Sequence, residues 1–165
     1  MLRIRQALDR LAALLRGVIV ILAVTMLAAL SLQVFMRFVI GQALSWSEEL
    51  ALLCFSWATL LSVALGVRDA IHVRMDLLVD LLPESMRNGI DRVISLAVAG
   101  LGAFVAWAGA RYVIDSLGTT SAAIGYPIAY LYACAPTCGA LIALFALERA
   151  VLGAPPQAQA TNLAR

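Results

Sequence analysis

The sequence predicts an all-α integral membrane protein with four transmembrane helices. Hydrophobic residues make up 63% of the chain and charged residues 13%, whereas a soluble domain has about 45–50% and 25%. Four long stretches carry no charged residue: 17–36, 50–67, 93–110 and 116–147. Since a helix rises about 1.5 Å per residue, roughly 20 apolar residues cross the hydrocarbon core of a bilayer. The chain therefore has room for one membrane domain and for little else.

The first two spans are expected over residues 17–36 and 49–67. A secretory signal peptide also begins with basic residues, but its apolar stretch is only about 7–15 residues long and ends at a small-residue cleavage site. Here the apolar stretch is longer and runs to Arg37 without a clear cleavage signal, so we interpret it as a retained span. Ser45 and Glu48 fit an S-x-x-E capping box at the start of the second span.

The third and fourth spans are expected over residues 93–110 and 128–147. The uncharged stretch before the fourth span is too long for a single crossing and contains two glycines, so we place residues 117–126 in a surface loop. Pro136 lies inside the fourth span and should kink it, because proline has no N–H to donate within a helix.

Two rows of small residues recur at every fourth position in the last two spans. Such rows let helix backbones approach closely in lipid. They either pack the third and fourth spans together or dock a partner. The rows are Gly102, Ala106 and Ala110 in the third span, and Ala135, Gly139 and Ala143 in the fourth.

We expect a single membrane domain over residues 1–152, followed by a disordered cytoplasmic tail over residues 153–165, which are mostly small and polar. Orientation follows from the arginines, because cytoplasmic loops carry an excess of basic residues. Of the 12 basic residues, all but Arg37 and Arg111 fall on one side of the expected spans. Both termini are therefore expected in the cytoplasm.

The segment between the second and third spans predicts an in-plane amphipathic helix in the cytoplasmic interface. Charged residues, among them His72 and Asp76, recur every three or four positions from Asp69 to Asp91, which confines them to one arc of a helix. Apolar residues cover the rest, as is typical of helices that lie flat on a membrane. A plain extension of the second span into water is the alternative.

Ionisable groups are absent from the middle of every expected span. Ion-coupled carriers place such groups at depth, because the ionisable group is the coupling device. A single histidine cannot supply paired haem ligands, and no nucleophile stands near a base. We therefore expect no cofactor, no metal site and no enzymatic activity. The net charge of +2 is too small to indicate nucleic-acid binding.

The residues around the first loop form the most distinctive pattern. Arg37 ends the first span, and Trp46 is expected at the membrane interface. Glu48 and Glu49 place negative charge at the positive end of the second helix. Two interpretations stay open for these residues: a purely structural role in capping and anchoring, or an ion pair or a contact with a partner.

In their order and spacing, these residues resemble the small membrane subunit of tripartite ATP-independent periplasmic (TRAP) transporters, the DctQ-like family. The family pattern has an arginine and an aromatic residue at the end of the first helix and a Trp followed by two Glu at the start of the second. A Trp, a Gly, a basic residue and a His-to-Asp signature follow. This chain carries the pattern as Arg37-Phe38, 45–51, Trp57, Gly66, Arg68 and 72–76. The resemblance covers about residues 17–152, and Asp69 departs from it, because the family is often more basic there.

The resemblance implies an accessory subunit of a transporter. Such a subunit has four membrane helices and binds a large polytopic membrane subunit that holds the substrate and sodium sites. A periplasmic binding protein delivers an organic acid, of carboxylate or sialic-acid type, and a sodium gradient drives its uptake across the bacterial inner membrane. The small subunit would act as a scaffold anchored in lipid.

Eight residues are candidates for contact with a partner or for a structural motif: Arg37, Trp46, Glu48, Glu49, Trp57, Arg68, His72 and Asp76. The alternative function is a self-sufficient four-helix carrier that acts as a homo-oligomer. A membrane enzyme or redox protein is a third interpretation, disfavoured by the missing ligands and nucleophiles.

Overall fold

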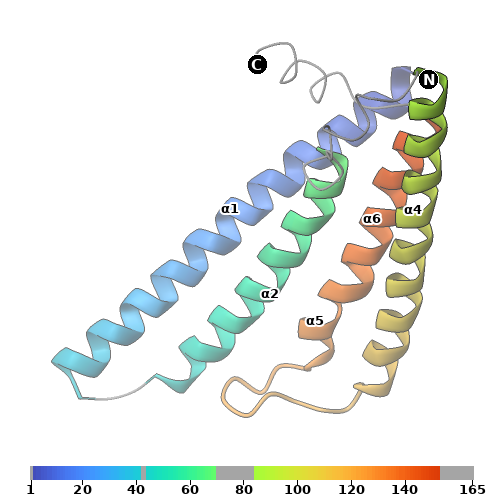
Figure 1. Ribbon diagram of the computed structural model, residues 1–165. Coiled ribbons are helices and arrows are strands. Elements are labelled where there is room, and N and C mark those ends of the chain that lie inside the picture. The colour runs from blue at the N-terminus through green and yellow to red at the C-terminus, as the bar shows by residue number, and fades with distance from the viewer. Residues whose placement is uncertain (1, 42–43, 70–83, 153–165) are drawn as a thin grey trace. The chain divides into compact units, whose positions relative to one another are not determined.

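The computed structural model describes residues 2–41, 44–69 and 84–152 of the chain, and helices make up most of them (Figure 1). The helices are α1 (Leu2–Val39), α2 (Ser45–Arg68), α4 (Glu84–Asp115), α5 (Ala129–Tyr132) and α6 (Cys134–Leu152). The strand-like pairing that joins Thr120 to Pro127 is an isolated bridge. The predicted all-α class is therefore confirmed.

Four helical stretches among the described residues are long and apolar enough to cross a membrane, as the sequence predicted. They are Arg5–Val39, Ser45–Arg68, Arg92–Asp115 and Ala129–Val151. The helix that holds the first span is longer than expected, because α1 already begins at Leu2. Leucine, alanine and arginine dominate this N-terminal segment, and all of them favour helix.

The expected in-plane helix falls largely outside the described residues. Residues 70–83, which include His72 and Asp76, are not described, so that helix stays a prediction there. Residues 84–91 carry the last charges of the same pattern, and they form the first turns of α4, which continues without interruption into the third span. The tail of residues 153–165 also lies outside the described part of the chain.

The chain divides into two compact units. The first contains the described residues of Met1–Ser62 and Arg111–Cys134, and the second those of Val63–Ala110 and Ala135–Arg165. The first unit thus holds α1, most of α2, the end of α4, the loop of residues 116–128 and α5. The second holds the end of α2, most of α4 and nearly all of α6.

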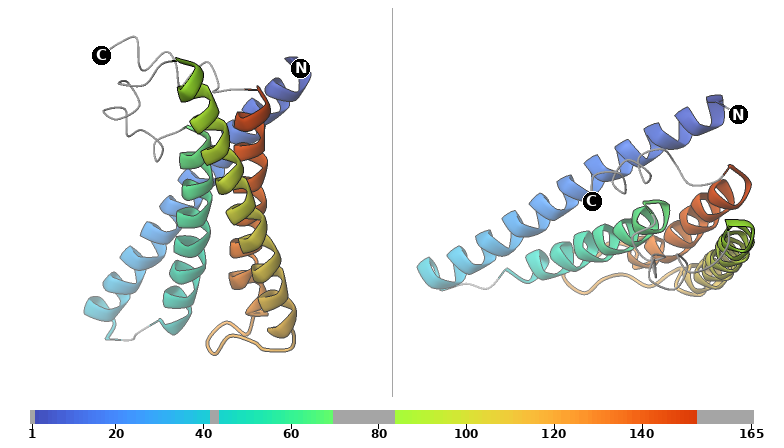
Figure 2. Two further views of the ribbon diagram at one scale, coloured as in Figure 1. Left: turned by 45° about the vertical axis from the view of Figure 1, so that its right-hand side comes forward. Right: turned by 45° about the horizontal axis from the view of Figure 1, so that its top comes forward.

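In the second unit, α4 and α6 pack backbone to backbone through their small residues. A Cβ atom added at Gly139 would lie 2.5 Å from the backbone nitrogen of Ala106, and one added at Gly102 would lie 2.7 Å from that of Ala143. Figures 1 and 2 show the two helices side by side. The small-residue rows therefore serve the first of their two expected roles, the packing of the third span against the fourth.

The fourth span is divided in two at Ala133. This residue is the C-cap of α5 and directly precedes Cys134, the first residue of α6. Pro136 lies in the first turn of α6. Because it has no N–H, it cannot donate to the carbonyl of Tyr132, which an uninterrupted helix would require. The break thus lies where the missing hydrogen bond would have been, next to the expected kink.

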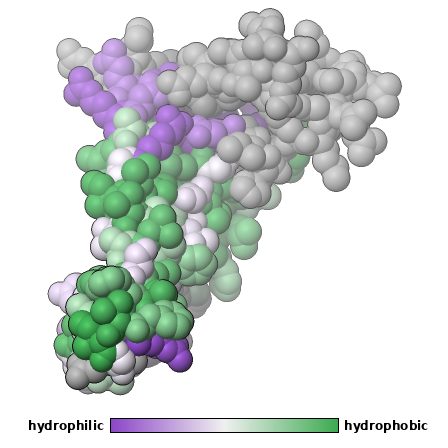
Figure 3. All heavy atoms as spheres, turned by 90° about the vertical axis from the view of Figure 1, so that its left-hand side faces the viewer, coloured by the Kyte–Doolittle hydropathy of each residue, from purple (hydrophilic) through white to green (hydrophobic). Residues whose placement is uncertain are grey.

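Helix α1 buries little of its most apolar stretch within the described structure. In the most apolar 18-residue window of α1, 6% of the window is buried. The corresponding share in α2 is 33%. In the space-filling view of Figure 3, hydrophobic residues cover the middle of the face and hydrophilic ones gather towards its ends. An exposed apolar surface of this kind suits contact with lipid or with a membrane partner.

Candidate functional site

The carboxylate of Glu49 binds the loop of residues 116–128. Its Oε2 accepts hydrogen bonds from the Ser121 hydroxyl at 2.6 Å and from the backbone N–H of Ile124 at 3.0 Å, and its Oε1 accepts one from the N–H of Ala123 at 2.8 Å. Both carboxylate oxygens are therefore used. Glu49 is one turn into α2, so these bonds join the start of that helix to a loop more than 70 residues away in sequence.

The loop itself is held in a defined hairpin-like shape. The N–H of Ser121 donates to the carbonyl of Tyr126 at 2.9 Å, and the N–H of Ile128 donates to the carbonyl of Thr119 at 3.1 Å. Gly125 has a φ of 77°, a left-handed conformation that suits glycine because it has no Cβ. Partial burial and the nearby charge of Glu49 raise the pKa of the Tyr126 phenol.

Glu48 binds a different element. Its Oε1 accepts a hydrogen bond from the side-chain amide of Gln33 in α1 at 2.7 Å, which joins α1 to α2 within the first unit. Ser45 is the first helical residue of α2, and the Ser47 hydroxyl donates to the carbonyl of Leu44 at 2.7 Å. The expected capping box between Ser45 and Glu48 is therefore wrong: within the described residues, Glu48 binds α1 and not the start of its own helix.

Arg37 and Trp46 are both exposed. Arg37 lies in the last turn of α1, where a cation is favourable at the negative end of the helix dipole. Trp46 is 39% exposed in the first turn of α2. The structure does not bring Arg37 into the networks of Glu48 and Glu49, whose hydrogen bonds go to other groups.

Trp57 has a role that the sequence did not suggest. Its indole N–H donates to the backbone carbonyl of Tyr130 in α5 at 3.0 Å. The Cys134 thiol likewise donates to the carbonyl of Leu131 at 2.8 Å. Both carbonyls lie beside the break between α5 and α6. In a bilayer, a broken helix needs such side-chain donors, because no water is present to satisfy its backbone.

Arg68 belongs to a buried ion pair in the second unit. Its Nε lies 3.4 Å from Oε2 of Glu148 in α6, and the two side chains are only 4% and 5% exposed. The guanidinium carbon also lies 5.5 Å from the centre of the Phe145 ring, within range for a cation–π interaction. Arg68 thus connects the end of α2 to α6.

Three of these contacts involve residues that sequence analysis missed: Gln33, Ser121 and Glu148. The sequence contained a weak indication that Glu148 pairs with an arginine. It is the first charged residue after the longest uncharged stretch, and a buried arginine needs a carboxylate nearby. Gln33 and Ser121 carried no such indication, since a polar residue near a span end is common. His72 and Asp76 lie outside the described residues.

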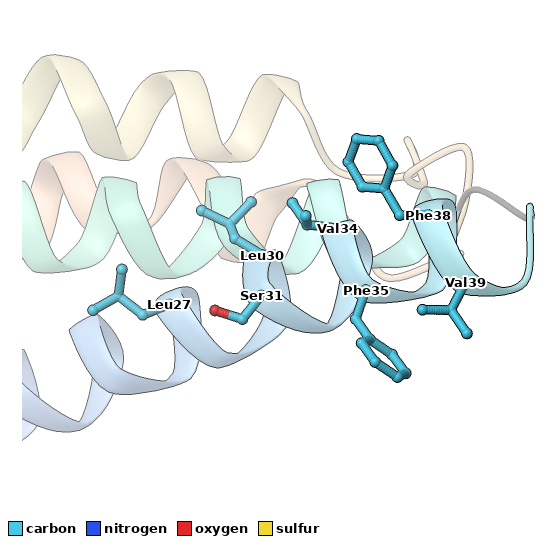
Figure 4. Close-up of a pocket in the computed structure, with 7 residues that line it drawn as sticks. All are labelled: Leu27, Leu30, Ser31, Val34, Phe35, Phe38 and Val39. Atoms are coloured by element: carbon cyan, nitrogen blue, oxygen red, sulfur yellow. The ribbon is translucent and has the colours of Figure 1, made fainter.

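An apolar hollow lies along the second half of α1 (Figure 4). It is lined by Leu27, Leu30, Ser31, Val34, Phe35, Phe38 and Val39. The lining comes from one helix, and the Ser31 hydroxyl is its one polar side-chain group, so the hollow is almost entirely apolar. Within the described residues, no group of three His, Cys, Asp or Glu is placed to hold a metal ion. The site residues thus form hydrogen bonds and an ion pair within the chain, and α1 provides an apolar surface for contact.

Residues 26–155 match the family model described as the DctQ component of tripartite ATP-independent periplasmic transporters. The chain is 28% identical to the ectoine TRAP transporter small permease protein TeaB of Halomonas elongata over 132 residues, which cover 78% of this chain and 68% of TeaB. The match confirms the resemblance seen in the motifs.

Two sialic acid systems also match. The chain is 30% identical over 116 residues to the small permease protein SiaQ of Vibrio cholerae, which covers 65% of this chain and 66% of SiaQ. It is 38% identical over 66 residues to the permease protein SiaT of Haemophilus influenzae, which covers 40% of this chain and 11% of SiaT. The matching family is a membrane component of transporters and not an enzyme. Together with the four spans, these matches identify a multi-pass membrane protein.

Proposed function

The chain belongs to the DctQ-component family of TRAP transporters, and we propose that it is the small accessory subunit of such a transporter. In this role it binds and anchors a large membrane subunit that carries out transport. The family match over residues 26–155 carries the proposal, because it includes all but the first nine residues of the first expected span and the whole of the other three.

The proposed partner is a large polytopic permease. A 66-residue part of this chain matches only 11% of SiaT, so in SiaT a similar segment belongs to the same polypeptide as a much longer permease. Where two such parts are separate chains, they are expected to bind one another. A periplasmic substrate-binding protein would complete the system.

The physical character of the chain supports a scaffold role. Its expected spans carry no ionisable group near their centres, so the sodium coupling that we propose would reside in the large subunit. The exposed apolar surface of α1 provides lateral contact area for lipid and for a membrane partner. The close packing of α4 on α6 provides a rigid support.

We place the protein in the bacterial inner membrane with both termini in the cytoplasm, since the arginines concentrate on that side. Residues 1–152 form its membrane domain in this proposal, and the amphipathic segment with His72 and Asp76 anchors it to the cytoplasmic interface. The first loop and the loop of residues 116–128 then face the periplasm.

The candidate residues divide by their contacts. Trp57 and Arg68 bind groups within the chain, which supports structural roles. Arg37 and Trp46 are exposed near the proposed periplasmic face and are the better candidates for direct partner contact. The two small permease relatives are named as parts of an ectoine and a sialic acid TRAP transporter, which supports an organic acid as the substrate class.

Affinity purification from the native membrane in mild detergent tests the proposal. We expect a much larger polytopic protein to co-purify in a stoichiometric amount, as identified by mass spectrometry. Recovery of this chain alone, folded and in a defined oligomer, would contradict the accessory role and favour the homo-oligomeric carrier.

A further inference from the structure

The loop beside the start of α2 presents a set of donors that converge on one carboxylate. Two successive backbone N–H groups, of Ala123 and Ile124, point at different oxygens of the Glu49 carboxylate, and the Ser121 hydroxyl completes the set. An ionised carboxylate offers only acceptors, which suits a site where several hydrogen-bond donors converge. Consecutive backbone N–H groups of this kind form concavities that bind anions.

The hydroxyl of Ser121 also organises the loop around the bound carboxylate. Its oxygen accepts a hydrogen bond from the N–H of Gly125 at 3.1 Å while its proton is donated to Glu49 at 2.6 Å. The residue thus closes the turn of residues 121–125 and binds the anion at the same time. Without the carboxylate, three donors would converge on empty space, which favours another loop conformation.

We propose that residues 121–125 form a receptor for a carboxylate group and that the Glu49 side chain is its resident occupant. Glu49 is then a positioning residue: it acts on partner binding by fixing this loop and not by touching the partner. The effect of Glu49 on partner binding rests on the proposed function. The fixed loop holds two apolar side chains outward, since Leu117 is 66% and Ile124 46% exposed.

The chemistry predicts which substitutions the receptor tolerates. In Glu49→Gln, one carboxylate oxygen is replaced by an NH₂ group, which donates hydrogen bonds. This NH₂ group would face a backbone N–H, so at least one hydrogen bond becomes a donor–donor contact. Glu49→Asp is one methylene shorter and cannot reach all three donors. Glu49→Ala removes a methylene and a carboxylate, which are the atoms of acetate, so acetate should fit the emptied receptor.

A spin label at Ala122→Cys in the full-length protein reports the order of the loop. Ala122 is exposed, and the three native cysteines are buried, so the protein without the added cysteine gives the background signal. We expect the label to become more mobile in Glu49→Gln, Glu49→Asp and Glu49→Ala. Addition of acetate, but not of chloride at the same ionic strength, should reverse the change in Glu49→Ala. Glu48→Gln is the matched control and should leave the label unchanged.

Unchanged mobility in the Glu49 variants would overturn the receptor, and so would a rise in mobility that acetate fails to reverse. If Glu49→Ala does not fold, Ser121→Ala tests the same point, because it removes one donor and should loosen the loop to a smaller extent. Co-purification of the large subunit is measured separately. A loosened loop with full recovery of a partner would refute the effect on binding but leave the receptor standing, whereas absence of any partner from the unmodified protein would refute the proposed function.

Discussion

Glu49 and Glu148 are both acidic residues whose contacts join distant parts of the sequence, yet their surroundings differ. Glu49 is partly exposed in the first unit and binds neutral donors, two backbone N–H groups and a hydroxyl. Glu148 is buried in the second unit and binds a buried cation, Arg68. The first contact arranges a loop, while the second holds charge inside an apolar protein.

This difference predicts what happens when each glutamate is substituted. A buried pair depends on both members, because removal of one leaves the other charged and out of reach of water. The donors around Glu49 can turn to water or to another carboxylate when it is removed, so the loop should change shape while the helices remain folded. Substitutions in the second unit should therefore affect stability most, and those around Glu49 should affect the loop.

The largest effect is expected for Glu148→Ala. The guanidinium of Arg68 would stay buried while losing the Glu148 carboxylate. Removal of one member of a buried ion pair costs about 3–5 kcal/mol of the free energy of unfolding. Denaturant titration of the purified protein in detergent measures the change. The double variant Arg68→Met with Glu148→Leu should recover most of the loss, since it removes both charges of the pair together. A double variant as unstable as the single one would contradict the pairing.

A somewhat smaller effect is expected for Gly139→Leu. A Cβ at this position would already lie 2.5 Å from the backbone of Ala106, so a larger side chain must push α4 and α6 apart. We expect a loss of roughly 1–3 kcal/mol, typical of overpacked cores. Gly100→Leu is the matched control, because Gly100 in α4 is exposed and has nothing within 4 Å of its added Cβ. Thermal unfolding should distinguish the two variants, and equal melting temperatures would refute the close packing.

Trp57→Phe should have a modest effect. It removes the indole N–H that binds the Tyr130 carbonyl and keeps most of the apolar surface. The loss of one hydrogen bond predicts about 0.5–1.5 kcal/mol. Hydrogen exchange of the amides in α5 measures this locally, and faster exchange there is the expected outcome. Exchange as slow as in the unmodified protein would show that the break between α5 and α6 does not need this donor.

The smallest effect is expected for Glu48→Gln. Glu48 is exposed, and a glutamine can still accept a hydrogen bond from Gln33. The change should stay within about 0.5 kcal/mol, as for most surface substitutions. Denaturant titration checks this. A loss as large as that of Glu148→Ala would mean that the contact between α1 and α2 carries far more of the stability than its exposure indicates.

Some of these features could be read from the sequence and others could not. Apolar length predicted the four spans directly, since the bilayer sets that length, and the glycines of the last loop predicted where helix would stop. The partner of Arg68 could not be predicted, because one sequence does not say which of several carboxylates meets a given arginine. The capping box failed for a similar reason: Ser45 and Glu48 have the right spacing, but Gln33 of a distant segment competes for the carboxylate.

Transport by the reconstituted protein tests the central claim most directly. The chain would be placed in proteoliposomes alone, and together with the large membrane protein that co-purifies with it and a substrate-binding protein. Accumulation of ectoine, sialic acid and simple organic acids would then be measured under an inward sodium gradient. We predict accumulation only when the large protein is present and a loss when this chain is omitted. Accumulation by this chain alone would contradict the accessory role.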